Sequence, residues 1–343
     1  MNSNSSTTEK NSQQVDTVRL QKLSRAFIES AALFAAIDLE LFTAIARGSN
    51  TAQKFAEFAE ITPTNADRLM TMCATMGLLE WSEQVYRNAP DVERFLVKDN
   101  EKYAGPWLQF SRPGWQRWGN LTEILSNPAP ASVLGTYSDM SVESARRYHT
   151  ATASVGFGSG RRFARQVDLS NRHKMMDLGG GSGAYSIVAV ETYPELEAVV
   201  FDLPPVVEVT REFVQRHNLT DRIKAVGGDF TRDVLPQGCD VVVMASNLPQ
   251  YSADIIQQVV SKAFGALLPG GEMHLIGEML DDERRGPVDA AIWGLNEALS
   301  NSTGVAHTRR ECVDFFNQAG FTNVSVVDFI PDILVRVSGR KPG

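Results

Sequence analysis

The chain has 343 residues, of which 43% are apolar and 22% are charged, and its formal net charge is −8. This composition is ordinary for a globular protein with room for two domains. The negative charge argues against a general nucleic-acid binder, because affinity for phosphates depends on clustered Lys and Arg.

The N-terminus and the cysteines predict neither a targeting segment nor a metal site. Residues 1–15 are polar and lack the apolar core of a signal peptide, so we expect a disordered tail and a cytoplasmic protein. No apolar run reaches the roughly 18 residues of a membrane span, so we expect no membrane partner. Cys73, Cys239 and Cys312 are scattered and odd in number, which indicates inert thiols and no bound metal.

Residues 16–170 predict a mainly helical region. Apolar residues recur at helical spacing from Val18 to Arg47, and a helix-turn-helix pattern follows, with a short hairpin from "GLLE" to "VYRN". This is a winged-helix pattern, and such modules often bind DNA. The second helix carries little positive charge beyond Arg68, so we expect a scaffolding or dimerising module that binds no nucleic acid.

Aromatic residues gather in the second half of this region. Those between residues 101 and 170 include Trp107, Phe110, Trp115, Trp118, Tyr137, Tyr148 and Phe157. Aromatic residues at helical spacing usually belong to a core. We expect a subset, Trp115, Trp118 and Tyr148, to line a substrate pocket.

Residues 171–343 predict a doubly wound parallel sheet. Short apolar runs alternate with helix-like segments, and the runs are "KMMDLGGG", "LEAVVFDLP", "IKAVGGDF", "CDVVVMAS" and "GEMHLIGEML". Alternation of buried strands and helices is typical of α/β proteins. "FTNVSVVDF" and "DILVRVSGR" predict a final pair of strands.

A glycine-rich turn follows the first of these strands. In "MMDLGGGSGAYS" the spacing is Asp177-x-Gly179-x-Gly181-x-Gly183, and glycine there lets the backbone approach a ligand at a helix N-terminus. The spacing departs from the dinucleotide pattern. An acidic residue suits a pyrophosphate poorly but can help hold a cationic amino-acid tail, directly or through water.

Two further strand ends carry carboxylates. Asp202, followed by Leu203, closes the next strand, where it can accept both hydroxyls of a ribose. Asp229, after Gly228, can accept an adenine amino group, and Phe230 offers an apolar wall for the ring. In this order, these residues favour S-adenosylmethionine as the cofactor.

The motifs that carry these residues also carry a family resemblance. "DLGGGSG", "FDLPPVV", "VGGDF", "LLPGGEMHLIGEML" and "NQAGF" resemble the small-molecule O-methyltransferases of plant and bacterial secondary metabolism. The resemblance covers nearly the whole chain. It implies a class I, Rossmann-like methyltransferase domain, an N-terminal winged-helix dimerisation domain and a homodimer. It also implies that Gly179, Asp202, Asp229, Phe230 and Ser246 line the cofactor, although Ser246 departs from the Lys or Arg often found there.

The sequence departs from this family at the catalytic base. The family histidine that deprotonates a substrate hydroxyl is matched by Pro249, in "LPQYSA", and proline has no ionisable side chain. Glu278 matches an acidic position that orients the histidine in the family. Tyr251, Glu278 and His307 are the candidates for a replacement base.

Four interpretations of the missing base stay open. A replacement base could serve a conventional O-methyltransferase, or the enzyme could methylate carbon in an already activated substrate. A thioether acceptor would need no base, because its sulfur has no proton to lose, and catalysis would rest on proximity and orientation. The protein could also be a relative that binds the cofactor without methylating.

A small acidic thioether would need an arginine for its carboxylate and an apolar pocket. Arg161 and Arg162 follow the helix that faces the substrate in the family, and Arg112 precedes the Trp115 and Trp118 pair. By the resemblance, two further residues, Trp293 and Asn296, belong to a helix that faces the pocket.

Within the family, the chain resembles the methylthiohydroxybutyrate S-methyltransferases of dimethylsulfoniopropionate synthesis. The resemblance implies 4-methylthio-2-hydroxybutyrate as the acceptor.

Overall fold

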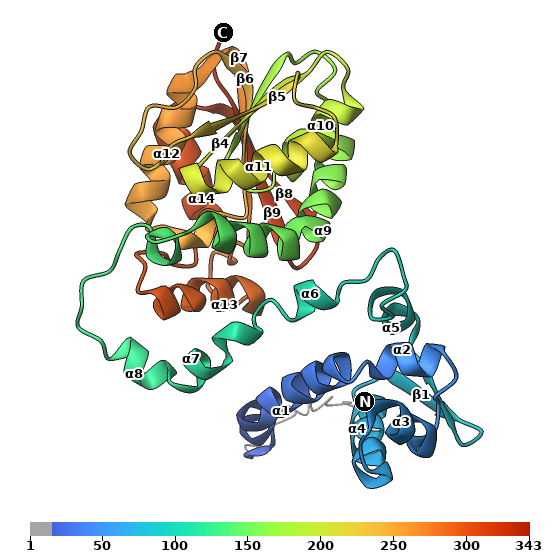
Figure 1. Cartoon of the computed structure of the whole chain (residues 1–343). Helices are drawn as coiled ribbons and strands as arrows, with labels where there is room; N and C mark the ends of the chain where they lie inside the picture. The colour runs from blue at the N-terminus through green and yellow to red at the C-terminus, as the bar shows by residue number, and fades with distance from the viewer. Residues whose placement is uncertain (1–15) are drawn as a thin grey trace, which may run out of the picture. The chain divides into compact units, whose positions relative to one another are not determined.

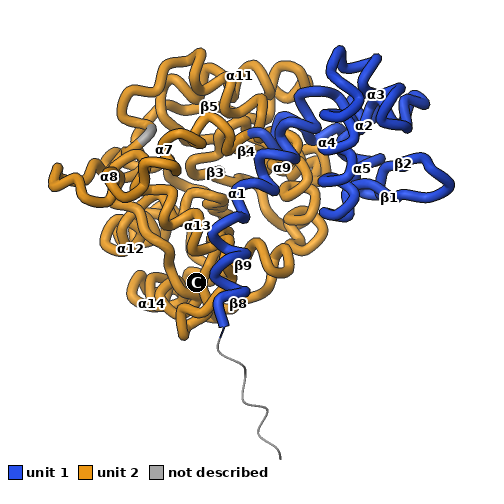
Figure 2. The backbone as a smooth tube through the Cα atoms, turned by 90° about the horizontal axis from the view of Figure 1, so that it is seen from below, with its two compact units in different colours: residues 1–109 blue, residues 110–343 orange. Residues whose placement is uncertain are grey.

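The structure is a computed structural model that describes residues 16–343. The tail expected at residues 1–15 lies outside the described residues. The chain forms two compact units that divide between Gln109 and Phe110 (Figure 2). The sequence analysis set this division near residue 170, but the long helix that ends there packs on two helices of the second unit. None of the helices in residues 16–343 is long and apolar enough to cross a membrane.

The first unit is a helical module with one hairpin. Its elements are α1 (Val18–Asp38), α2 (Leu41–Ala46), α3 (Ala52–Ala59), α4 (Pro63–Thr75), β1 (Leu79–Ser82), β2 (Val85–Asn88), α5 (Pro90–Phe95) and α6 (Gly105–Leu108). The side chains of Thr51 and Thr62 cap α3 and α4 by accepting backbone N–H groups. Glu83 and Gln84 both adopt left-handed conformations between β1 and β2, as a two-residue hairpin turn requires. The predicted helix-turn-helix and hairpin are confirmed.

The second unit contains a seven-stranded sheet with helices on both faces (Figure 1). Its helices are η1 (Arg112–Gly114), α7 (Trp115–Gly119), α8 (Leu121–Leu125), η2 (Gly135–Tyr137), α9 (Val142–Gln166), α10 (Ala184–Thr192), α11 (Pro204–Arg216), η3 (Leu248–Gln250), α12 (Ala253–Ala266), α13 (Val288–Asn296), η4 (Glu297–Ser300) and α14 (Arg309–Ala319). Its strands are β3 (Lys174–Leu178), β4 (Glu197–Asp202), β5 (Ile223–Gly227), β6 (Cys239–Ala245), β7 (Leu267–Gly277), β8 (Thr322–Ile330) and β9 (Leu334–Arg340).

The strand order fixes where a ligand can bind. The order is β5-β4-β3-β6-β7-β9-β8. The strands from β5 to β7 in this order are parallel, and β9 runs antiparallel to both of its neighbours, β7 and β8. The chain order reverses between β3 and β6, and open α/β sheets bind ligands at such a point, outside the carboxyl ends of the strands. One core lies between the sheet and α12 and α14, and a second lies under α9, α10 and α11. The predicted doubly wound sheet and final strand pair are confirmed.

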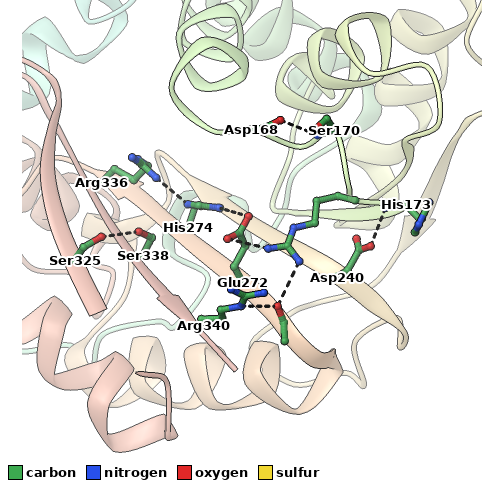
Figure 3. Close-up of polar contacts among 12 residues, drawn as sticks. Asp168, Ser170, His173, Asp240, Glu272, His274, Ser325, Arg336, Ser338 and Arg340 are labelled. Atoms are coloured by element: carbon green, nitrogen blue, oxygen red, sulfur yellow. Dashed lines mark hydrogen bonds and ion pairs between the residues drawn. The ribbon is translucent and has the colours of Figure 1, made fainter. Parts of the chain in front are cut away.

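A group of charged side chains with little exposure joins β7, β9 and the segment before β3 (Figure 3). Arg172 Nη2 lies 3.1 Å from Glu272 Oε2, and Arg336 Nη1 lies 3.1 Å from His274 Nδ1. Burial lowers the pKa of His274, so the neutral ring can accept a hydrogen bond from Arg336. Among these four side chains, Arg172, Glu272, His274 and Arg336, Glu272 supplies the only carboxylate and the two arginines supply two guanidinium groups.

We predict that Glu272→Gln lowers the free energy of unfolding by about 2–4 kcal/mol, because it removes the carboxylate partner of a mostly buried arginine. The Arg172 side chain is 17% exposed and would keep only neutral acceptors, the carbonyl of Gly270 and the new amide oxygen. The exposed Arg309–Asp328 pair provides the control. Asp328→Asn should lower the free energy of unfolding by less than about 1 kcal/mol. Urea denaturation at one protein concentration measures both, and equal costs would contradict the prediction.

Candidate active site

The loop after β3 has a backbone that requires glycine. Gly179, Gly181 and Gly183 have φ values of +67°, +57° and +74°, in the left-handed region that other residues rarely adopt. A Cβ on Gly181 would lie 2.6 Å from His149 Cε1, and one on Gly179 would lie 2.7 Å from Asn247 Nδ2. Conformation and close approach therefore both exclude a side chain here.

Hydrogen bonds tie this loop to two strand ends. Asp202, at the end of β4, accepts the N–H of Gly181 at 2.8 Å and that of Leu203 at 2.7 Å. Asn247, just after β6, donates from Nδ2 to the carbonyls of Gly179 at 3.1 Å and Ala245 at 2.9 Å. Burial raises the pKa of Asp202 to about 6, so its carboxylate is mostly ionised at neutral pH.

Asp177 lies beneath the loop rather than on its surface. Its carboxylate is buried and accepts a hydrogen bond from Ser186 Oγ of α10 at 2.9 Å. A Cβ on Gly180 would lie 2.5 Å from Asp177 Cγ, and burial raises the pKa of Asp177 to about 6. Asp177 therefore joins β3, the loop and α10. Its contact with a cofactor tail stays a prediction.

The predicted adenine site lies after β5. Asp229 accepts the N–H of Thr231 at 2.9 Å and the Nε–H of Arg232 at 2.8 Å. Burial alone would raise the pKa of Asp229, but these hydrogen bonds outweigh it and lower the pKa. The Phe230 ring is buried and meets the Tyr251 ring edge-on at 5.3 Å. An ionised carboxylate and a buried aromatic ring thus follow each other in the loop after β5.

The remaining predicted cofactor residues also follow strand ends. Ser246 is exposed and left-handed, with a φ of +60°, and such strain in a non-glycine residue is often found at functional sites. Leu203 directly precedes α11. At Gly228, packing alone excludes a side chain, because a Cβ there would lie 2.3 Å from the Phe201 ring. The predicted cofactor residues therefore lie at the carboxyl ends of β3, β4, β5 and β6.

The segment around Pro249, where the sequence analysis predicted that the family base is missing, is part of the core. Pro249 is buried within η3. Tyr251 is buried as well, and its burial raises the pKa of the phenol. His307 is 1% exposed, with Nε2 2.9 Å from the carbonyl oxygen of Tyr251, and burial lowers its pKa. These contacts give His307 a role in supporting the turn around Pro249.

Glu278 differs from the other two candidate bases. It follows β7, and burial raises its pKa to about 7. Within the described part of the chain, no other residue donates a hydrogen bond to its carboxylate. A pKa of about 7 lies in the range where a general base works best at neutral pH.

His149, on α9, is a site residue that the sequence did not reveal. Its ring is buried, packs against Gly181 and meets the Tyr148 ring edge-on at 5.0 Å. Burial lowers its pKa to about 4, so the ring is neutral at physiological pH. The one sequence signal was the small residues along α9, such as Gly156 and Gly160, which let this helix lie close to α10.

A pocket of about 250 Å³ lies between α7 and α13. It is lined by Phe110, Ser111, Pro113, Gly114, Arg117, Trp118, Trp293, Asn296 and Leu299. Three of these, Trp118, Trp293 and Asn296, were predicted to bind substrate, whereas Arg117 was not.

The other predicted substrate residues do not line this pocket. Tyr148 meets the pocket residue Phe110 edge-on at 5.1 Å. Trp115 lies outside the lining. On α9, Arg161 is exposed and Arg162 has a buried Nε without a hydrogen-bond partner. The roles of Trp115, Tyr148, Arg161 and Arg162 in substrate binding stay predictions.

Family models and curated relatives match nearly the whole chain. Residues 132–322 match the O-methyltransferase domain, and residues 21–98 match the O-methyltransferase dimerisation domain. The chain is 31% identical to the tetracenomycin polyketide synthesis 8-O-methyl transferase TcmO of Streptomyces glaucescens, over 94% of this chain and 96% of that protein. The chain belongs to the O-methyltransferase family. It is an S-adenosylmethionine-dependent methyltransferase, which sets aside the non-methylating relative considered from the sequence.

Other relatives agree with this assignment. The methyltransferase is 32% identical to the 3-hydroxy-5-methyl-1-naphthoate 3-O-methyltransferase of Streptomyces sahachiroi, over 90% of this chain and 91% of that protein. The structure of human N-acetylserotonin methyltransferase in complex with SAM has a TM-score of 0.79 and 24% identity, covering 97% of this chain and 99% of that chain. A putative O-methyltransferase from Nostoc punctiforme has a TM-score of 0.85 and 21% identity, covering 96% and 100%. These structures confirm the class I methyltransferase fold.

We predict that Gly181→Ala weakens cofactor binding at least about tenfold, because the added methyl group would displace the His149 ring or the loop. A left-handed alanine by itself costs about 1–2 kcal/mol. Gly238→Ala isolates this backbone cost, since Gly238 has a φ of +75° with no atom within 4 Å of its Cβ position. Titration calorimetry with S-adenosylhomocysteine compares the two variants, and equal losses of affinity would contradict the prediction.

Proposed function

We propose that the strand ends described above bind S-adenosylmethionine. Asp202 accepts the ribose hydroxyls, Asp229 accepts the adenine amino group, and Phe230 covers the adenine ring. When bound, the cofactor supplies a methyl group on a sulfonium cation. The left-handed glycines and the acidic strand ends support this assignment, because they suit a cationic nucleoside that carries no phosphate.

We further propose that the acceptor is a thioether, 4-methylthio-2-hydroxybutyrate, and that the product is the sulfonium precursor of dimethylsulfoniopropionate. The observation that carries this proposal is Pro249, which fills the family's base position with a buried, non-ionisable side chain. A thioether sulfur attacks through its lone pair, so the new S–C bond forms as the donor's S–CH3 bond breaks. No proton is released, and the protein has only to hold the two reactants in line.

The pocket between α7 and α13 supports a small acceptor. Its volume of about 250 Å³ lies below the roughly 300–1,000 Å³ of sites for drug-sized ligands. Trp118 and Trp293 place indole rings in its wall. The faces of such rings attract cations, which favours a product that carries a sulfonium charge.

O-methylation is the second candidate, and Glu278 is the observation that favours it. Burial raises the pKa of Glu278 to about 7, so this carboxylate could remove a proton from a hydroxyl group. Two of the curated relatives also have names that describe O-methylation. The two candidates differ in whether Glu278 has to take up a proton during turnover.

The variant Glu278→Gln distinguishes S-methylation from O-methylation. With the thioether we predict a kcat within about threefold of wild type and no dependence on pH near neutrality, because no base is needed. If Glu278 is a base, the kcat of the variant should be about 10²–10⁴-fold lower than that of wild type. The wild-type rate should also fall as the pH drops through about 7, because the carboxylate becomes protonated. Transfer of labelled methyl groups to the thioether and to phenols measures both. The absence of labelled sulfonium with wild-type protein would refute S-methylation.

We propose that the enzyme is a homodimer and that α1 forms part of the interface. Apolar side chains along α1 are exposed, namely those of Val18, Leu20, Leu23, Phe27 and Ile28. Exposed apolar patches of this kind mark sites of protein association. The match of residues 21–98 to a dimerisation domain supports a second copy of this chain as the partner.

We predict that the double variant Leu23→Glu with Phe27→Glu is mainly monomeric, because buried carboxylates would face apolar surface in the dimer. Lys54→Glu adds a carboxylate on α3 instead and should leave the dimer intact. Sedimentation velocity at micromolar protein concentration measures both. A double variant that sediments as the wild type would place the interface elsewhere.

A further inference from the structure

Arg117 lines the pocket between α7 and α13. Arg117 belongs to α7, and no residue in the described part of the chain forms an ion pair or a hydrogen bond with its side chain. It is also the only charged residue among those that line the pocket. The pocket wall therefore carries one positive charge, on a side chain that is exposed to solvent and free to contact a ligand.

The chemistry of this wall suits a carboxylate. A guanidinium group donates two parallel hydrogen bonds to a carboxylate in a fixed geometry. Ser111 and Asn296 add neutral polar groups to the same wall, and Trp118 and Trp293 supply its apolar part. This combination matches a short apolar chain that ends in an acid.

Aromatic rings connect this pocket with the cofactor loop. Phe110 lines the pocket and meets Tyr148 edge-on at 5.1 Å. Tyr148 in turn meets His149 at 5.0 Å, and His149 packs against Gly181. The pocket wall at Phe110 is therefore connected to the loop that we propose holds the methyl donor.

We propose that Arg117 binds the carboxylate of the acceptor and that Trp118 and Trp293 hold its apolar chain. This inference rests on the proposed methylation of a small acidic thioether. It assigns recognition of the acid to α7 instead of to Arg161 or Arg162. It also makes the carboxylate a requirement for an acceptor, so neutral analogues of the same shape bind poorly.

Binding of an unreactive acceptor analogue tests the proposal without turnover. 2-Hydroxyhexanoate replaces the thioether sulfur by a methylene group, and 1,2-hexanediol lacks the carboxylate as well. Calorimetry on the full-length protein saturated with S-adenosylhomocysteine should show the diol binding at least about tenfold more weakly than the acid. Arg117→Gln should lower the affinity for 2-hydroxyhexanoate by about 10–100-fold and leave the affinity for the diol unchanged. Arg165→Gln, an exposed arginine on α9, should match wild type.

The outcomes separate this inference from the proposed function. Equal affinity of wild type and Arg117→Gln for the acid would overturn the inference, as would equal affinity of wild type for acid and diol. Tight, Arg117-dependent binding of the acid without methylation of the thioether would overturn the proposed reaction and leave the carboxylate site standing. If both hold, Arg117→Gln should raise the KM for the thioether at least about tenfold, with kcat within about threefold.

Discussion

The site depends on a glycine loop that is fixed on two sides. Asp202 holds the loop from the end of β4, and Asn247 holds it from the end of β6. The loop follows β3, and β4 and β6 are the neighbours of β3 on its two sides. Both halves of the sheet therefore fix the position of the loop. His149 packs on Gly181 from a third direction. A donor held by this loop therefore has little freedom relative to α9 and the pocket beyond it, as an enzyme that works by alignment requires.

The turn around Pro249, the predicted position of the family base, is held in place by contacts with other parts of the chain. Gln250, next to Pro249, donates from Nε2 to the Tyr137 hydroxyl at 2.9 Å. The carbonyl of Tyr251 lies within hydrogen-bond distance of His307. These contacts anchor the segment where the family places its histidine. A histidine put back at this position would enter a buried site, where desolvation lowers the pKa of an imidazole. Restoring the residue would not by itself restore a competent base.

The sequence predicted features whose cause is local and missed those that depend on distant contacts. The glycine spacing after β3 and the acids at strand ends follow from backbone needs within a few residues. Arg117 lines the pocket opposite α13, and His149 packs on the glycine loop from α9. No spacing in the chain records either placement. Gly228 shows a third limit, since a glycine beside a ligand site can be required by the neighbouring ring of Phe201 instead. The boundary expected near residue 170 followed composition, whereas the packing of α9 decides it.

The carboxyl groups around the site bear on whether the reaction needs a proton transfer. Asp177, Asp202 and Glu278 are carboxyl groups whose pKa values burial raises, so any further negative charge nearby is costly. A hydroxyl acceptor would have to give up its proton during transfer, either to a carboxylate such as Glu278 or to solvent. A thioether exchanges one sulfonium for another, so the net charge of the reactants is the same before and after transfer. The acid group of such an acceptor still has to be kept away from the carboxylates, and the proposed contact with Arg117 would hold it in the pocket between α7 and α13.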